Sequence, residues 1–229
     1  MSASPSASLP TSLAAFVGEL SAEIAPLFTS AFQIRGFPVT WFELLAFTLA
    51  IAMVVCNMRV NPAGWPLAIA SSLLYCMLFA RSRLYGDAAL QIFFVVIAAW
   101  GWRQWLYAKD DTGQALGVQR LGMRGRWTLV GVFALAWPAT GIFLRRFTDT
   151  DVPWWDAFPT ALSVIGQWLL GRKYIENWPT WVVVNVVSAS LFAYKALWLT
   201  TALYVVFIVL SFIGWRAWQL RLVARTHPA

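Results

Sequence analysis

The sequence predicts an all-α polytopic membrane protein with seven transmembrane helices in a 3+1+3 arrangement of two parallel three-helix repeats. Composition predicts the membrane: 60% of the 229 residues are hydrophobic, 12% are charged and 15 are tryptophans. A soluble domain of this size keeps a polar face on its helices and strands, whereas here whole segments near twenty residues long have almost none. A repeat at a constant spacing of 113 residues predicts the 3+1+3 order.

The first segment, residues 1–40, is expected to precede the spans. Residues 1–12 are rich in Ser, Ala and Pro and are expected to be flexible. Residues 13–28 have apolar spacing near the helical period but carry Glu19 and Glu23, which favours an amphipathic helix at the membrane interface over a span. This helix lacks the basic start and strong apolar core of a cleaved signal peptide, so we expect it to stay in the mature chain.

Seven apolar segments follow, each long enough to cross about 30 Å of hydrocarbon at about 1.5 Å per residue, the shorter ones with help from flanking aromatic residues. The expected spans are residues 41–58, 65–80, 86–105, 127–145, 154–171, 178–195 and 197–218. The one substantial polar loop lies between the third and fourth spans and separates the two halves of the chain. The expected parts are a first repeat at 41–107, a cytoplasmic linker at 108–126, a connecting helix at 127–147, a second repeat at 154–220 and a tail at 221–229.

The two repeats align without a gap. Residues that match at the spacing of 113 are Trp41 with Trp154, Arg59 with Arg172, Trp65-Pro66 with Trp178-Pro179, Leu84 with Leu197, and GWRQW (101–105) with GWRAW (214–218). This predicts a duplicated three-helix unit. Three spans leave the chain on the opposite face of the membrane, so the odd connecting span makes the copies parallel. Parallel repeats are a transporter architecture, with the substrate near the midplane between the halves.

The charge distribution predicts the orientation. Eleven of the 17 Lys and Arg residues fall on the side that holds the C-terminus. Because basic residues concentrate in cytoplasmic loops, the C-terminus is expected in the cytoplasm and the N-terminus outside. Basic cytoplasmic edges also account for the net charge of +7 without a nucleic-acid partner, and lipid is the expected surrounding.

Several classes of chemistry are disfavoured. The one histidine, His227, is the third residue from the end of the given sequence, and Cys56 and Cys76 lack metal-ligand or redox spacing. No phosphate-binding loop motif for nucleotide hydrolysis occurs. We therefore expect no catalytic residue, metal or cofactor. A membrane enzyme would need paired acid and base groups at one depth, and a purely structural protein gives no reason for amides inside apolar spans.

Polar and aromatic residues present in one repeat alone are candidates for binding an asymmetric substrate. Two of them, Trp181 and Asn185, form one helical stripe with the repeated Trp178, and this stripe runs from the interface into the membrane. An unpaired amide in lipid is costly, so this stripe should face the bundle interior or a cavity. Indole faces beside amides suit a planar heteroaromatic ligand with hydroxyls, and a cationic ring would gain further from the indole quadrupole.

Other roles remain open for the residues of this stripe. Trp178 also fits an aromatic belt at the membrane interface, and Trp181 fits it less well because it lies one turn deeper. Asn185, and Gln91 in the third span, also fit hydrogen bonds that fasten one helix to another.

Charged residues near the span ends have two interpretations as well. Glu43 and Asp156 occupy matching positions in first turns, where they favour the helix dipole or form a carboxylate ring that draws cations to an outer vestibule. Glu176 and Asn177 directly precede the span at 178, where capping is expected.

Two stretches, RKYIENWPTWVVVNVVS (172–188) and LYGDAALQIFFVVIAAWGWRQW (84–105), resemble the Pnu family of bacterial vitamin transporters, most closely its nicotinamide riboside transporters. The first contains the W-x-x-W element of that family, and the resemblance extends over roughly residues 41–220. It implies a 3+1+3 helix arrangement related to the SWEET sugar transporters and a homotrimer. It also implies facilitated diffusion of a vitamin that a cytoplasmic vitamin kinase traps by phosphorylation.

The resemblance implies that Trp178 and Trp181 line the substrate cavity, with Asn185 below them and Gln91 contributing from the third span. Further candidates, chosen by asymmetry and depth, are Asn57, Gln167 and Tyr85. The expected function is uniport of nicotinamide riboside across the bacterial inner membrane. Thiamine or riboflavin is the alternative substrate, because family members carry these vitamins too and thiamine shares a flat cationic ring. Proton coupling stays open, although no relay of carboxylates and histidines lies within the spans.

Overall fold

The structure, a computed structural model, describes residues 25–34, 37–81, 85–110, 113–148, 150–195 and 198–226. They fall into two compact units, one up to Thr48 and one from Leu49, which we describe separately. Within the described residues, seven α-helices occupy the seven expected apolar segments. These are α2 (Trp41–Met58), α3 (Gly64–Arg81), α4 (Tyr85–Tyr107), α5 (Met123–Phe147), α6 (Pro153–Gly171), α7 (Asn177–Tyr194) and α8 (Trp198–Thr226).

The first unit contains a small antiparallel sheet that the all-α prediction did not include. A short 3-10 helix, η1 (Ala25–Phe28), precedes β1 (Ser30–Ile34), which pairs with β2 (Phe37–Thr40) and carries an irregularity between Ser30 and Phe32. The aromatic and β-branched residues of this stretch favour extended backbone. Most of the expected interfacial helix, with Glu19 and Glu23, lies outside the described residues.

The helix ends lie close to the expected span ends, with two extensions. Helix α8 continues to Thr226, because the residues after 218 include strong helix formers and no glycine or proline before Pro228. Helix α5 begins four residues early, at Met123. Of the described helices, α5 and α8 alone contain a stretch long and apolar enough to be recognised as a membrane span from length and composition.

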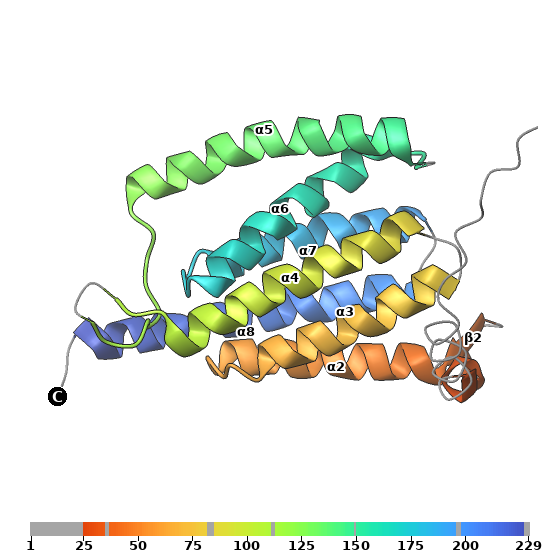
Figure 1. Cartoon of the computed structure of the whole chain (residues 1–229), viewed down its shortest axis with the longest axis horizontal. Helices are drawn as coiled ribbons and strands as arrows, with labels where there is room; N and C mark the ends of the chain where they lie inside the picture. Colours follow the sequence, from red (N-terminus) through yellow and green to blue (C-terminus); the bar gives the residue numbers. More distant parts are fainter. Residues whose placement is uncertain are drawn as a thin grey trace, which may run out of the picture. The chain divides into compact units, whose positions relative to one another are not determined.

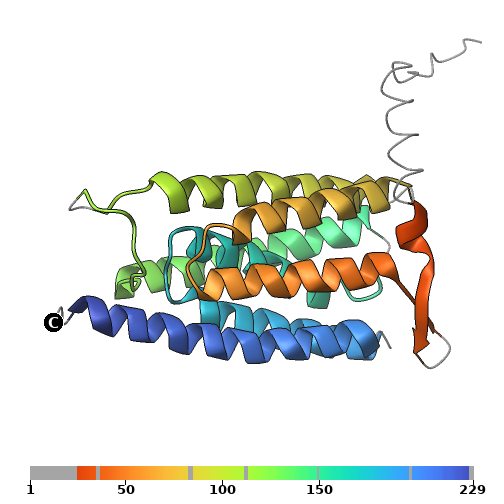
Figure 2. The same cartoon turned by 90° about the horizontal axis from the view of Figure 1, so that it is seen from below.

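The helices from Leu49 onward run alongside one another (Figures 1 and 2). Packed pairs are α3 with α4, α4 with α6, α5 with α6, α6 with α7, and α7 with α8. Helix α5 packs against α6 and lies at the edge of this unit (Figure 1), and its buried residue is Gly141, on which the ring of Trp154 rests. The remaining apolar side chains of α5 are suited to lipid.

Four buried tryptophans pack together in the core of the second unit, and we call them the indole cluster: Trp65, Trp105, Trp178 and Trp218. The ring centroids of Trp65 and Trp105 are 5.6 Å apart at an interplanar angle of 84°, and those of Trp178 and Trp218 are 5.6 Å apart at 88°. Trp105 also lies 6.3 Å from Trp218. The two edge-to-face pairs are related by the spacing of 113 residues, so equivalent sequence positions make equivalent contacts.

Two glycines let the indoles approach the neighbouring helix. The six-membered ring of Trp65 lies against Gly101 in α4, and that of Trp178 lies against Gly214 in α8, at distances that leave no room for a Cβ atom. These glycines begin the GWRQW and GWRAW motifs. Close packing against an indole ring therefore explains why both motifs begin with glycine.

Gly214→Ala is expected to destabilise the protein by about 1–3 kcal/mol, because the added methyl group overlaps a buried ring that cannot move freely. The matched variant is Gly131→Ala in α5, where an added Cβ meets open space and no loss is expected. Gly131→Ala should even gain up to about 1 kcal/mol from helix propensity. Thermal unfolding of both variants in detergent measures the difference, and equal losses would contradict this account of the packing.

At the end of the unit where α2 and α6 terminate, the linker between α4 and α5 is held against the turn after α6. Gln119 donates its backbone N–H to the Lys173 carbonyl at 3.0 Å and accepts from the Ile175 N–H at 2.9 Å. The buried Lys173 ammonium donates to the Leu116 carbonyl at 2.8 Å and lies 5.0 Å from the Trp105 ring centroid. Arg59 directly follows α2, and Arg172 directly follows α6. We call this end of the unit, with Arg59, Arg172 and Lys173, the basic end.

The expected capping by Glu176 and Asn177 is wrong in its detail. Glu176 is the N-cap residue of α7 but its side chain makes no capping hydrogen bond. Its carboxylate instead accepts from the Leu121 N–H at 3.1 Å and from Arg126 at 2.8 Å, because the linker brings these donors beside it. Asn177 is the first residue of α7 and donates its amide to the Tyr174 carbonyl at 2.6 Å.

Candidate functional site

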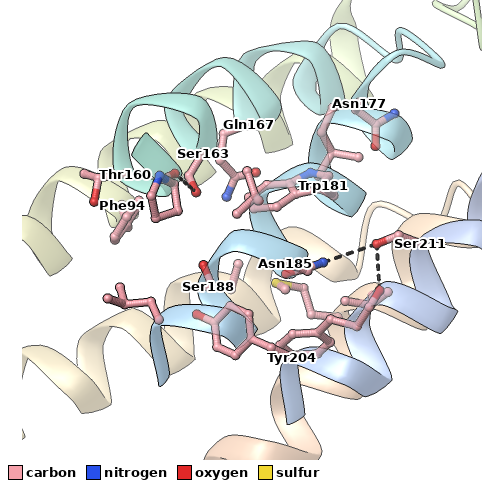
Figure 3. Close-up of a pocket in the computed structure, with 18 of the residues that line it drawn as sticks. Phe94, Thr160, Ser163, Gln167, Asn177, Trp181, Asn185, Ser188, Tyr204 and Ser211 are labelled. Atoms are coloured by element: carbon pink, nitrogen blue, oxygen red, sulfur yellow. Dashed lines mark hydrogen bonds between the residues drawn. The ribbon is translucent and has the colours of Figure 1, made fainter. Parts of the chain in front are cut away.

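A cavity of about 570 Å³ lies within the second unit, and all seven helices contribute to its wall. This volume is in the range of small-molecule sites. One lining residue from each helix, in chain order, is Asn57, Trp65, Phe94, Leu144, Gln167, Trp181 and Tyr204. In Figure 3, Gln167 extends from α6 towards Trp181 of α7, and Tyr204 and Ser211 of α8 lie across from it.

The structure brings together five of the seven residues that the sequence nominates. Those lining the cavity are Asn57, Gln167, Trp178, Trp181 and Asn185. Gln91 is half-buried in α4 and does not line the cavity, whose contact from α4 is Phe94. Tyr85 begins α4, but its side chain lies outside what the structure describes.

The two indoles of the W-x-x-W element are both packed inward. Trp178 is 3% exposed, which does not fit a lipid-facing aromatic belt. The ring of Trp181 crosses Gly166 of α6, where an added Cβ would lie 3.1 Å from the ring. The small residue on α6 therefore makes room for the Trp181 ring beside the cavity.

Asn185 combines the two roles left open for it. Its amide donates to the Ser211 hydroxyl of α8 at 3.4 Å, and that hydroxyl donates to the Phe207 carbonyl at 2.7 Å. The amide therefore fastens α7 to α8 while it lines the cavity (Figure 3). On the facing wall, the Ser163 hydroxyl donates to the Pro159 carbonyl at 2.7 Å, which leaves the lone pairs of its oxygen as acceptors.

Five buried polar atoms on cavity-lining residues make no hydrogen bond within the described part of the chain. They are Oδ1 of Asn57, Oε1 of Gln167, Oδ1 of Asn177, and Nε1 of Trp65 and Trp178. Buried polar atoms are nearly always paired, because an unpaired one costs about 1–3 kcal/mol. All three acceptors and both donors belong to residues that line one cavity, which suits a ligand that draws these side chains towards it.

Sequence reasoning missed Asn177 and Trp65 as cavity residues. Asn177 is completely buried, and its position in the first repeat is held by Gly64, so the criterion of asymmetry between repeats selects it. Its place just before the expected span at 178 instead predicts a helix cap. Trp65 is matched by Trp178, so no difference between the repeats marks it.

Among the described residues that line the cavity, two are charged, and they pair with each other. Lys195 Nζ lies 3.6 Å from Asp156 Oδ2 and 3.6 Å from Asp151, and the Thr150 hydroxyl donates to Asp156. Neither proposed role for Asp156, at the helix dipole or in a carboxylate ring, anticipated this ion pair. The cavity lining, as described, includes no arginine, the residue best suited to bind phosphate. No group of three potential metal ligands occurs in the described ranges.

A protein-family model described as "Nicotinamide mononucleotide transporter" matches residues 40–220, most of the chain. The chain belongs to this family. Membership makes it a multi-pass membrane transporter of the vitamin-transporting PnuC type and not an enzyme, and it confirms the resemblance to the Pnu family.

Individual members show how far the similarity extends. The nicotinamide riboside transporter PnuC of Escherichia coli is 22% identical over 207 residues, which cover 80% of this chain and 87% of that protein. The riboflavin/roseoflavin transporter RibM of Streptomyces davaonensis is 22% identical over 202 residues, covering 87% and 94%. A crystal structure of the vitamin B3 transporter PnuC has the same fold, with a TM-score of 0.65 at 21% identity, covering 93% of this chain and 90% of that one.

Proposed function

We propose that this protein carries nicotinamide riboside across the bacterial inner membrane by facilitated diffusion, with a cytoplasmic vitamin kinase retaining the product. The observation that carries the proposal is a cavity lined by Trp181 and by five residues that each have an unpartnered polar atom. A flat cationic pyridinium ring suits an indole face. The ribosyl hydroxyls and the carboxamide offer donors to the oxygens of Asn57, Gln167 and Asn177, and acceptors to the indole N–H groups.

The charges of the cavity favour a nucleoside over a nucleotide. Lys195 is already shared between Asp156 and Asp151, and the described lining offers no guanidinium to a phosphate. A phosphate dianion would lose its hydration without a matching partner, which is costly in a closed site. The name of the family includes the mononucleotide. Binding measurements with the nucleoside and the nucleotide therefore decide between the two ligands.

Calorimetric titration of the detergent-purified protein with nicotinamide riboside, its mononucleotide, thiamine and riboflavin tests the proposal. We expect nicotinamide riboside to bind and the mononucleotide to bind at least about tenfold more weakly, about 1.4 kcal/mol. If riboflavin, which RibM carries, or thiamine binds more tightly, the proposed substrate is wrong, and the proposed mechanism of facilitated diffusion stands. Binding of none of them by folded protein would overturn the proposal.

For the architecture we propose two parallel repeats, residues 41–107 and 154–220, joined by the linker 108–126 and the connecting segment 127–147. The matching contacts of Trp65 with Gly101 and of Trp178 with Gly214 support this pairing. In the proposed orientation the basic end and the tail 221–229 face the cytoplasm, and three copies assemble as in the family. Access alternates when the repeats rock about the cavity, and uniport fits the absence of a proton relay among the described cavity residues.

A further inference from the structure

Two members of the indole cluster donate hydrogen bonds from one proposed repeat to the other. Nε1 of Trp105 in α4 donates to the Leu170 carbonyl in α6 at 2.9 Å, and Nε1 of Trp218 in α8 donates to the Asn57 carbonyl in α2 at 3.1 Å. Both bonds are buried. The donors are 113 residues apart and so are the acceptors, which means that each repeat supplies one donor and one acceptor.

Each acceptor carbonyl belongs to the last turn of its helix and has a second donor nearby. The Val60 N–H donates to the Asn57 carbonyl at 3.1 Å, and the Lys173 N–H donates to the Leu170 carbonyl at 3.0 Å. Val60 and Lys173 also share the left-handed backbone conformation, with φ of 56° and 55°. Because a carbonyl oxygen accepts two hydrogen bonds, either indole can leave without stranding a buried acceptor. This is the property required of a contact that opens and closes.

The acceptor residues also touch the cavity. Asn57 and Leu170 both line it, and Oδ1 of Asn57 is one of its unpartnered atoms. Trp65 and Trp178 line the cavity too, and the other two indoles of the cluster pack edge-on behind them. The indole cluster therefore fills the space between the cavity and the turns at the basic end.

We propose that Trp105 and Trp218 are the gate residues of the basic end, and that their two reciprocal indole–carbonyl bonds must break before a ligand leaves the cavity in that direction. This inference rests on the proposed transport function. Asn57 lines the cavity, and its backbone carbonyl accepts the Trp218 hydrogen bond, so one residue belongs both to the cavity wall and to the closed end. Rocking of the repeats separates both donors from their acceptors at once, because each bond crosses between the repeats.

The test measures access to the cavity from each side of the membrane without any substrate. A Ser188→Cys reporter in the cavity wall is placed in a background with Cys56→Ser and Cys76→Ser. A charged, membrane-impermeant maleimide is added to right-side-out or inside-out vesicles. Combining Trp105→Phe with Trp218→Phe, which keeps aromatic rings and removes both N–H donors, should raise the labelling rate from the basic end about tenfold and leave the rate from the other side unchanged.

The matched control is Trp215→Phe, because Trp215 also lies in α8 and packs against the same core without belonging to the gate. Its labelling rate should equal that of the parent. Unchanged labelling in the double variant, or an equal rise from both sides, overturns the proposal. If the double variant is not monodisperse, the two single variants decide, each with an expected rise of about threefold. The labelling assay contains no substrate, so it tests the gate independently of the substrate. If labelling from the basic end rises but the protein does not bind nicotinamide riboside, the proposed substrate is wrong and the gate is supported.

Discussion

Trp181→Ala is expected to weaken the binding of nicotinamide riboside by about ten- to a hundredfold. The Trp181 ring lines the cavity, and Gly166 on α6 gives it the space to do so. Stacking of a base on an aromatic side chain contributes about 1–3 kcal/mol, and about 1.4 kcal/mol corresponds to tenfold in affinity. Calorimetric titration of the detergent-purified variant measures the loss, and uptake into vesicles should fall with it.

Two further variants separate stacking from folding. Trp181→Phe keeps a flat aromatic face and should recover binding to within about tenfold of the parent. Trp127→Ala removes an indole that is 68% exposed on α5 and should leave binding unchanged. If a monodisperse Trp181→Ala protein binds nicotinamide riboside with the affinity of the parent, the Trp181 ring does not contact the ligand. That result would contradict the proposed stacking.

The helices were predictable because lipid imposes a simple rule on the sequence. A segment with few polar residues must hydrogen-bond its own backbone, and the seven apolar segments are accordingly helices. The sheet of β1 and β2 was not predicted, since a stretch before the spans is not subject to that rule and its aromatic and β-branched residues act locally. The extension of α8 to Thr226 was missed because the expected helix ended with the apolar run rather than at the next proline.

Comparison of the repeats located part of the candidate site and could not locate the rest. Asn57, Gln167 and Asn185 differ between the repeats and line the cavity, whereas Gln91 differs and does not. Asymmetry indicates that a position is under a different demand in each repeat, but it does not say in which direction a side chain points. Trp65 could not be selected in this way, because it is repeated and its role depends on packing against Gly101.

Gln167→Met should change stability and affinity in opposite directions. Oε1 of Gln167 is buried and unpaired within the described residues, so a side chain of similar length without that atom should stabilise the unliganded protein by about 1–2 kcal/mol. For a chain of this size the thermal midpoint would rise by about 2–8 °C. Affinity for nicotinamide riboside should fall about tenfold, because the ligand loses an acceptor. Thermal unfolding and titration of the same preparation measure both effects.

Asn185→Leu provides the contrast that gives this result its meaning. The Asn185 amide has a partner in Ser211, so its loss should lower stability as well as affinity. Gln219→Met, on the exposed face of α8, should alter neither. An unpaired polar atom that binds the ligand destabilises the empty protein, whereas a polar group that hydrogen-bonds two helices together stabilises it. The sign of the change in stability therefore distinguishes the two roles. A loss of stability in Gln167→Met would therefore place Gln167 among the fastening groups and argue against its role in the site.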